Sequence, residues 1–252
     1  MAQDTYFSGQ GVIYLAERDA GGNAKAFEDA RNAPVFKFSL KTETMEHKES
    51  RTGQRLTDLR LIKGKSAECT MTLEVFDKER LALVLYGAHS AIDAGTVTDE
   101  EMPTGLLAGQ FYGTAKPNIS NVVVTDSAGT PATLAPGADY RVASAGGGMI
   151  EILNVGTYVQ PFLVSYSNGA ATNINMMTGN APERWVRFVG VNTADNNASV
   201  IVDLYRVSFD PLKELDMISD DIAKYELAGS VLIDSSKESD ATLGQFGRII
   251  KV

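Results

Sequence analysis

The sequence predicts a mainly β protein: an antiparallel β-sandwich or partial barrel with one packed α-helix, interrupted in mid-chain by a smaller β domain. Three observations lead to this prediction. Apolar and polar residues alternate along several segments, one segment has the pattern of a capped helix, and charged residues are nearly absent from a central stretch. A chain of 252 residues with 44% hydrophobic content is long enough to bury a sizeable core.

The clearest alternation runs from residue 66 to 76. Apolar residues such as Cys69 and Met71 share one face there, and polar residues such as Glu68 and Thr70 share the other. A period of two is typical of a half-buried strand. We expect further strands of the same domain at 35–41, 185–191, 199–209 and 223–233.

One helix is expected, and one further segment is expected to be a short helix or a turn. In "DKERLALVLYG", Asp77 is placed to be the N-cap, good helix formers follow, and Gly87 is placed to end the helix. A second, short helix or turn is expected from Asp210, with Pro211 at the first helical position.

The central stretch differs in composition from the rest of the chain. Residues 114–175 carry five charged side chains in 62 residues, whereas the other 190 residues carry 50. Turns rich in Gly and Ser separate short β-type runs at 121–125, 140–143, 149–153 and 161–167. We therefore expect an immunoglobulin-like domain at 114–175, inserted between the two halves, 1–113 and 176–252, of one larger domain.

The sequence contains no recognisable catalytic or metal-binding pattern. The two histidines have no ligand-spaced partners, and the single cysteine, Cys69, falls in a strand pattern, where a small buried hydrophobe is expected. The acidic pairs 100–101 and 220–221 are interpreted as solvated loops. A pI near 4.8 opposes phosphate attraction, and no apolar run reaches the length of a membrane span. We expect no catalytic residue, no metal or other cofactor, and no membrane insertion.

A basic segment interrupts this acidic chain. Residues 41–65, here called the arm, hold seven Lys/Arg against four Asp/Glu, while the whole chain has a net charge of -9. So much charge cannot be core, so we expect a long exposed hairpin or loop, which is either simply solvated or a docking element. The candidate docking residues are Glu46, His47, Lys48, Glu49, Arg51, Arg55, Asp58, Arg60, Lys63 and Lys65.

A complementary surface is available near the end of the chain. Residues 210–240 contain nine Asp/Glu and three Lys. Contacts between this acidic segment and the arm of another copy would be head-to-tail, which produces rings and open stacks. The candidate acidic residues are Asp210, Glu214, Asp216, Asp220, Asp221 and Glu226.

Four segments resemble the major tail tube proteins of long-tailed, siphovirus-like bacteriophages. The resemblance covers residues 5–113 and 182–234, most of the chain outside the expected insertion. The segments are "YFSGQGVIYLAERD", "EHKESRTGQRLTDLRL", "CTMTLEVFDKERLALVLYG" and "VDLYRVSFDPLKELDMISDDIAKYELAGSVLID".

The resemblance implies a structural virion protein. Family members are β-sandwiches with a flanking helix that join their sheets in hexameric rings and stack these rings into a tube. The loop at 41–65 would reach the adjacent ring, and 114–175 would be an outer immunoglobulin-like domain. The implied partners are other copies of the chain, the tape measure protein, and the distal tail or baseplate and tail terminator proteins. The implied location is the phage tail, after assembly in the host cytoplasm.

DNA would pass through such a tube without specific binding. Because duplex DNA carries about one negative charge per 1.7 Å, a negative wall lets it slide, and we expect the excess carboxylates to face the lumen. The alternatives are a distal tail or tube-terminating protein of similar fold, a non-viral β-sandwich binding module, and a secreted hydrolase with a dispersed triad.

Overall fold

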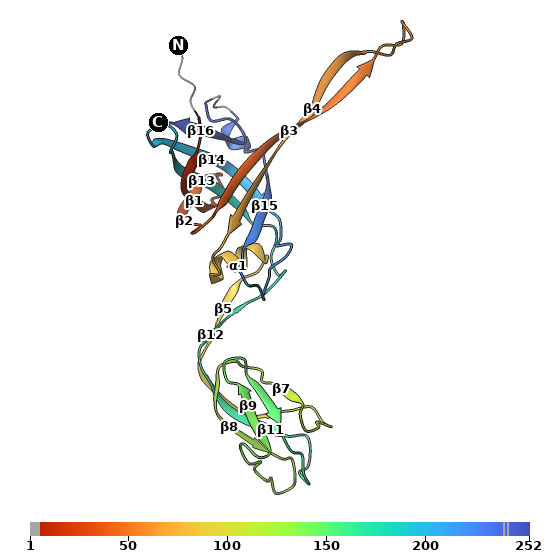
Figure 1. Cartoon of the computed structure of the whole chain (residues 1–252), viewed down its shortest axis with the longest axis vertical. Coiled ribbons are helices and arrows are strands. Elements are labelled where there is room, and N and C mark those ends of the chain that lie inside the picture. Colours follow the sequence, from red (N-terminus) through yellow and green to blue (C-terminus); the bar gives the residue numbers. More distant parts are fainter. Residues whose placement is uncertain (1–5, 239, 241) are drawn as a thin grey trace. The chain divides into compact units, whose positions relative to one another are not determined.

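A computed structural model describes residues 6–238, 240 and 242–252. The chain is mainly β, with antiparallel sheets and one α-helix among the described residues, as the sequence predicts (Figure 1). It divides into two compact units, Met1–Ala88 with Asn175–Val252, and His89–Ile174. No helix in the described part of the chain has the length and apolar character needed to cross a membrane.

The first unit is built on one antiparallel sheet with the order β2-β1-β13-β14-β15-β4-β3, and β16 pairs with β14 beside this path. The strand segments expected at 35–41, 66–76, 185–191, 199–209 and 223–233 all contribute to it. The bounds are β1 Gly9–Arg18, β2 Ala24–Asp29, β3 Val35–Lys48, β4 Thr57–Leu73, β13 Glu183–Asn192, β14 Ala198–Phe209, β15 Tyr225–Val231 and β16 Gly247–Lys251.

The core of this unit lies between two parts of the same sheet. Ile13 of β1, Met71 of β4 and Leu227 of β15 are almost fully buried in one apolar cluster. Phe36 of β3 stacks on Phe188 of β13, with the ring centroids 5.6 Å apart. Strands far apart in the sheet order therefore pack face to face, because alternating apolar side chains on both must leave water.

The first helix prediction is confirmed, with one correction at its end. Helix α1, Lys78–Val84, begins after Asp77, whose carboxylate accepts a hydrogen bond from the Arg80 amide. The residue with positive φ after the helix is Tyr86, at 52°, and not Gly87. Gly87 is needed for another reason: a Cβ at this position would lie 1.9 Å from the carbonyl oxygen of Asn175.

The short helix or turn expected from Asp210 does not form. Residues 210–216 are irregular, and their backbone donors are used in tertiary contacts. The amide of Asp210 donates to the Ala228 carbonyl and that of Leu212 donates to the Val84 carbonyl. Leu212 and Leu215 pack against the core, so tertiary burial outweighs the local capping signal.

The second unit contains two three-stranded antiparallel sheets, with the orders β7-β10-β9 and β6-β11-β8, and a short ladder of β12 and β5. Its own apolar core includes Ile150, Phe162 and Val164. The bounds are β5 His89–Ile92, β6 Gly95–Glu101, β7 Phe111–Gly113, β8 Ile119–Thr125, β9 Tyr140–Ser144, β10 Met149–Ile152, β11 Leu163–Asn168 and β12 Ala171–Ile174.

This unit begins earlier than the change in composition suggests. It starts at His89 and not at 114, because β6 and β7 supply strands to its two sheets. Charged residues such as Asp99 and Glu101 on β6 are exposed, so the segment matches the charge density of the first unit. Glu100 accepts hydrogen bonds from the hydroxyls of Tyr112 and Tyr166, both at 2.6 Å, and thereby ties the two sheets together.

A buried carboxylate fastens the end of the chain to the first unit. Asp203 of β14 is fully buried and accepts hydrogen bonds from the indole of Trp185 at 3.1 Å, from Arg187 at 2.6 and 3.0 Å, and from Arg248 at 3.2 Å. Burial disfavours the charged form, but the hydrogen bonds from Arg187 and Trp185 outweigh it and hold the pKa of Asp203 below its ordinary value. Strand β16 is thus held by side chains as well as by its backbone ladder.

We expect Asp203→Ala to lower the free energy of unfolding by about 2–3 kcal/mol, because two arginines lose their anion. The loss is smaller than for a fully buried pair, since Arg187 and Arg248 keep a third of their side-chain surface exposed. Urea denaturation would measure it. Asp195→Ala, which removes an exposed pair with Lys251, is the control, and equal effects of the two changes would contradict this account.

We also expect the first unit to fold without the second. The chain leaves it at Ala88 and returns at Asn175, whose amide donates to the Ala88 carbonyl at 3.1 Å. Replacing residues 89–174 by a short Gly-Ser linker should change the free energy of unfolding by less than about 1 kcal/mol, because a short loop costs little to close. Loss of a single cooperative transition in thermal denaturation would refute this.

Candidate assembly surfaces

The arm extends beyond its sheet as a two-stranded ribbon (Figure 1). Strand β15 pairs with β4 only from Ala67 to Leu73, whereas β3 and β4 pair with each other from Val35 to Lys48. The remainder of the ladder therefore has no third strand among the described residues. The exposed hairpin that the charge pattern predicts is present, and its turn lies between Lys48 and Thr57.

Two of the four acidic residues of the arm have local hydrogen-bond partners, while most of its basic residues form no ion pair with the described residues. Asp58 accepts from His47 at 2.6 Å, and Glu49 accepts from the amides of Arg51 and Thr52, which closes the turn. Hydrogen bonds from Thr52 lower the pKa of Glu49 and keep it charged. In the described part of the chain, no ion pair involves Lys48, Arg51, Arg55, Arg60, Lys63 or Lys65.

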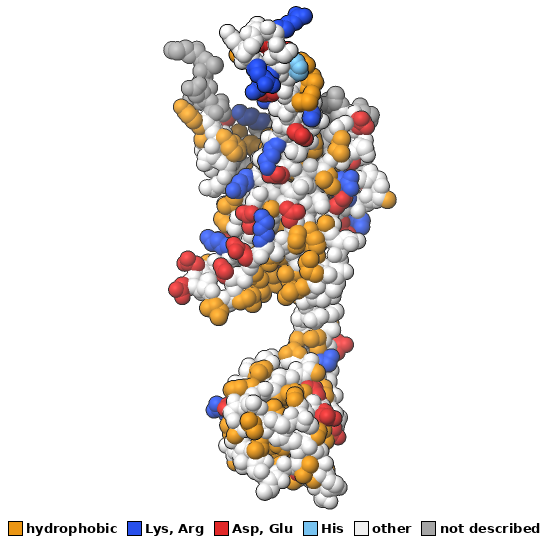
Figure 2. All heavy atoms as spheres, turned by 90° about the vertical axis from the view of Figure 1, so that its right-hand side faces the viewer, with side chains coloured by type: hydrophobic (Ala, Val, Ile, Leu, Met, Phe, Trp, Pro, Cys, Tyr) orange, Lys and Arg blue, Asp and Glu red, His pale blue; other side chains and the backbone are white. Residues whose placement is uncertain are grey.

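The arm also carries apolar side chains in solvent. Ile62 is 61% exposed and Leu56 is 60% exposed, and Figure 2 shows apolar atoms beside Lys and Arg side chains on the hairpin. A ribbon of two strands has no layer to cover either face. The exposed apolar residues of the arm are Met45, Leu56, Leu59, Leu61 and Ile62.

Sequence reasoning missed part of this apolar surface. Phe36, Phe38 and Leu40 alternate along β3, and Leu40 is 72% exposed because the opposing layer ends before it. Met45 lies on the other face of β3 from Leu40, because the extra residue of the bulge near Glu43 belongs to β4. The alternation was the available signal, but the extent of the opposing layer cannot be read from a strand pattern.

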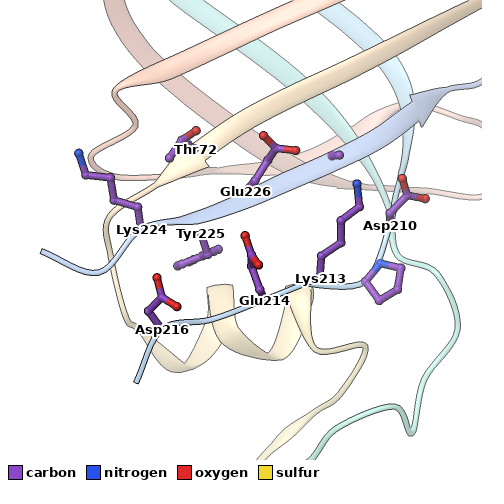
Figure 3. Close-up of a pocket in the computed structure, with 10 residues that line it drawn as sticks. Thr72, Asp210, Lys213, Glu214, Asp216, Lys224, Tyr225 and Glu226 are labelled. Atoms are coloured by element: carbon purple, nitrogen blue, oxygen red, sulfur yellow. The ribbon is translucent and has the colours of Figure 1, made fainter. Parts of the chain in front are cut away.

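The structure brings together four of the six predicted acidic residues. Asp210, Glu214, Asp216 and Glu226 line a hollow of about 280 Å³ beside β15 (Figure 3). Lys213 and Lys224 lie at the same hollow, so the surface has mixed charge. The other two predicted residues, Asp220 and Asp221, are exposed in the adjoining irregular segment and do not line it.

Neither a candidate metal site nor an exposed thiol is found among the described residues. These contain no group of three or more His, Cys, Asp and Glu side chains placed to hold a metal ion. Cys69 is buried in the core, and burial raises the pKa of its thiol to about 12.

A family model described as "Protein of unknown function UCP028589" matches residues 6–250. No curated protein matches the sequence.

We expect the arm to be the least protected ladder of the first unit. Amides of residues 44–48 and 57–62 should exchange with solvent at least about tenfold faster than those of residues 200–204 in β14, because a two-stranded ribbon opens without disturbing the core. Hydrogen exchange of the dilute, monomeric protein would measure this. Equal protection of the two regions would show that the arm is already covered in the monomer.

Proposed function

The chain belongs to the family whose model matches residues 6–250, and we propose that it is the repeating subunit of a bacteriophage tail tube. In this proposal the protein is a structural virion component and not an enzyme. Copies form hexameric rings, the rings stack, and the tube conducts genomic DNA during ejection.

The observation that carries the proposal is the exposed arm. It combines at least five large exposed apolar side chains with several basic groups that have no ion-pair partner among the described residues. Burying a large apolar side chain contributes about 1.5–3 kcal/mol, and exposed patches of this kind mark contact surfaces. An arm that reaches another copy would gain this burial, as the resemblance to tail tube proteins implies for residues 41–65.

Open strand edges support the formation of rings. β2 and β3 are the end strands of the eight-stranded sheet. The outer edge of β3 runs over 14 residues without a partner strand in the described part of the chain. Free backbone donors and acceptors on a long edge are a template for pairing with another chain. In the proposed ring, neighbouring copies join through such edges into a continuous inner barrel.

The second unit suits a role as an outer decoration. It has its own core and is connected to the first unit through two adjacent chain positions, Ala88 and Asn175. We propose that it is an immunoglobulin-like domain, an assignment supported by its two small antiparallel sheets. The structural partners proposed for the tube are the tape measure, distal tail or baseplate, and terminator proteins of the same virion.

The net charge of -9 fits transport without retention. A tube lined by carboxylates repels duplex DNA at every ring, whereas a basic lining would bind it. The same acidity gives the basic arm a complementary surface on other copies. The hollow that contains Asp210 and Glu226 is one such surface, although its lysines reduce the attraction.

We expect Arg51→Glu with Arg55→Glu to abolish tube formation while leaving the monomer folded. Both side chains are exposed near the turn of the arm, so the free energy of unfolding should change by less than about 0.5 kcal/mol, whereas docking on an acidic surface becomes repulsive. Negative-stain electron microscopy of concentrated protein measures assembly, and circular dichroism measures folding.

The matched control reverses two exposed lysines outside the arm. Lys78→Glu with Lys116→Glu gives the same change in net charge, and both side chains are exposed and lie on neither strand edge. Tubes should form with this control. Tubes of normal length from the arm variant would rule out arm docking, and a wild-type protein that stays monomeric under all conditions would rule out the proposed function.

A further inference from the structure

One end of the first unit's core is open. An apolar groove of about 630 Å³ lies between the start of β1 and the start of β3. Phe36, Phe188 and Val202 line it, and all three belong to or pack against the apolar core cluster. The groove is therefore an unfilled continuation of the core and not a separate surface feature.

Paired glycines make room for an aromatic ring at this end of the core. Gly11 of β1 and Gly190 of β13 are register partners. A Cβ on Gly11 would lie 2.4 Å from the Val189 carbonyl oxygen, and one on Gly190 would lie 2.3 Å from the ring of Phe188. The ring of Phe188 thus occupies the space above both glycines, and it forms part of the wall of the groove.

The rim of the groove is apolar and open to solvent. Phe7 is 67% exposed, and Val35 and Phe38 are 38% and 36% exposed. Of the described residues that line the groove, the only charged one is Lys37, which has no ion-pair partner among the described residues. The groove thus suits an apolar segment that carries negative charge.

Such a segment exists in the chain. Residues 217–222 form an irregular loop in which Met217, Ile218 and Ile222 are 74%, 97% and 72% exposed. Its acidic residues are Asp216 just before it and Asp220 and Asp221 within it, and it contains no Lys or Arg. The loop is anchored by Leu215, which packs against the core, and by buried Tyr225 a few residues after it.

We propose that the groove of one copy binds the 217–222 loop of a second copy. Ile218 and its apolar neighbours would lie against Phe36, Phe188 and Val202 in the groove, and Asp220 and Asp221 would approach Lys37. The arm is a poorer occupant, because its net charge of +3 opposes Lys37. This inference rests on the proposed self-assembly and adds to it a second pair of contact surfaces, distinct from the arm.

Disulfide cross-linking tests the pairing directly. Val35→Cys and Ile218→Cys are made as separate proteins, mixed at a concentration that permits assembly, and treated with a mild oxidant. Cys69 stays in place, because its buried thiol does not compete. We expect a covalent dimer in the mixture, and neither variant alone should give more than a trace of it.

Two matched mixtures test whether a different segment binds in the groove. Val35→Cys is also mixed with Ile249→Cys, at an exposed position on β16, and with Leu59→Cys, on the arm. The Ile218→Cys mixture should give the most dimer. Equal yields in all three mixtures, or a preference for Leu59→Cys, would overturn the proposal. An internal disulfide in the monomeric double variant Val35→Cys/Ile218→Cys, formed in place of the dimer, would show that the loop folds onto its own groove and would also overturn it.

A charge swap provides a second readout. Lys37→Glu should weaken association about fivefold, and Asp220→Lys with Asp221→Lys in the same chain should restore it, since an exposed pair contributes up to about 1 kcal/mol. Analytical ultracentrifugation measures both, and failure of the rescue would contradict the proposed charge pairing. If tubes form but the mixture of Val35→Cys and Ile218→Cys gives no cross-link, this inference fails and the proposed function stands. If the cross-linked dimer forms but tubes never do, the proposed function fails and this inference stands.

Discussion

The exposed features of the first unit depend on a mismatch in length between strands of its sheet. β3 and β4 continue together well past the point where β15 and the opposing layer end. A strand within the layered region buries one face, but the same strand beyond it exposes both faces. The arm, the exposed apolar residues on it and the long free edge of β3 all follow from this mismatch. Such features are costly for a solitary protein and useful for a subunit.

Charged residues are also unevenly distributed between the surfaces of the molecule. The chain is acidic overall, yet the arm is basic, and one of its carboxylates, that of Glu49, holds the turn through hydrogen bonds. In contrast, the acidic groups near the C-terminal end share their hollow with lysines, while those of the 217–222 loop stand beside exposed apolar residues. Together with the apolar groove, these surfaces provide several distinct contacts, which the proposed stacked rings require in two directions.

Local pattern reasoning succeeded where the chain's own period decides the structure. The alternation around Met71 and the cap at Asp77 are both present as expected. It failed at Asp210, where the cap signal was overruled because Leu212 and Leu215 gain more by packing against the core. The charge boundary also misplaced the start of the second unit, because exposed charges on β6 resemble those of the first unit.

By itself, the sequence determined the β class, the capped helix, the exposed basic hairpin and the absence of a recognisable catalytic pattern, since each depends on neighbours within a few residues. Only the tertiary structure decided which strands lie opposite one another, and hence where the core stops. That Gly11 meets Gly190, and that a hollow opens beside Phe188, depends on residues nearly 180 positions apart. Contacts over such separations are fixed by how the sheet folds over itself, which no local period encodes.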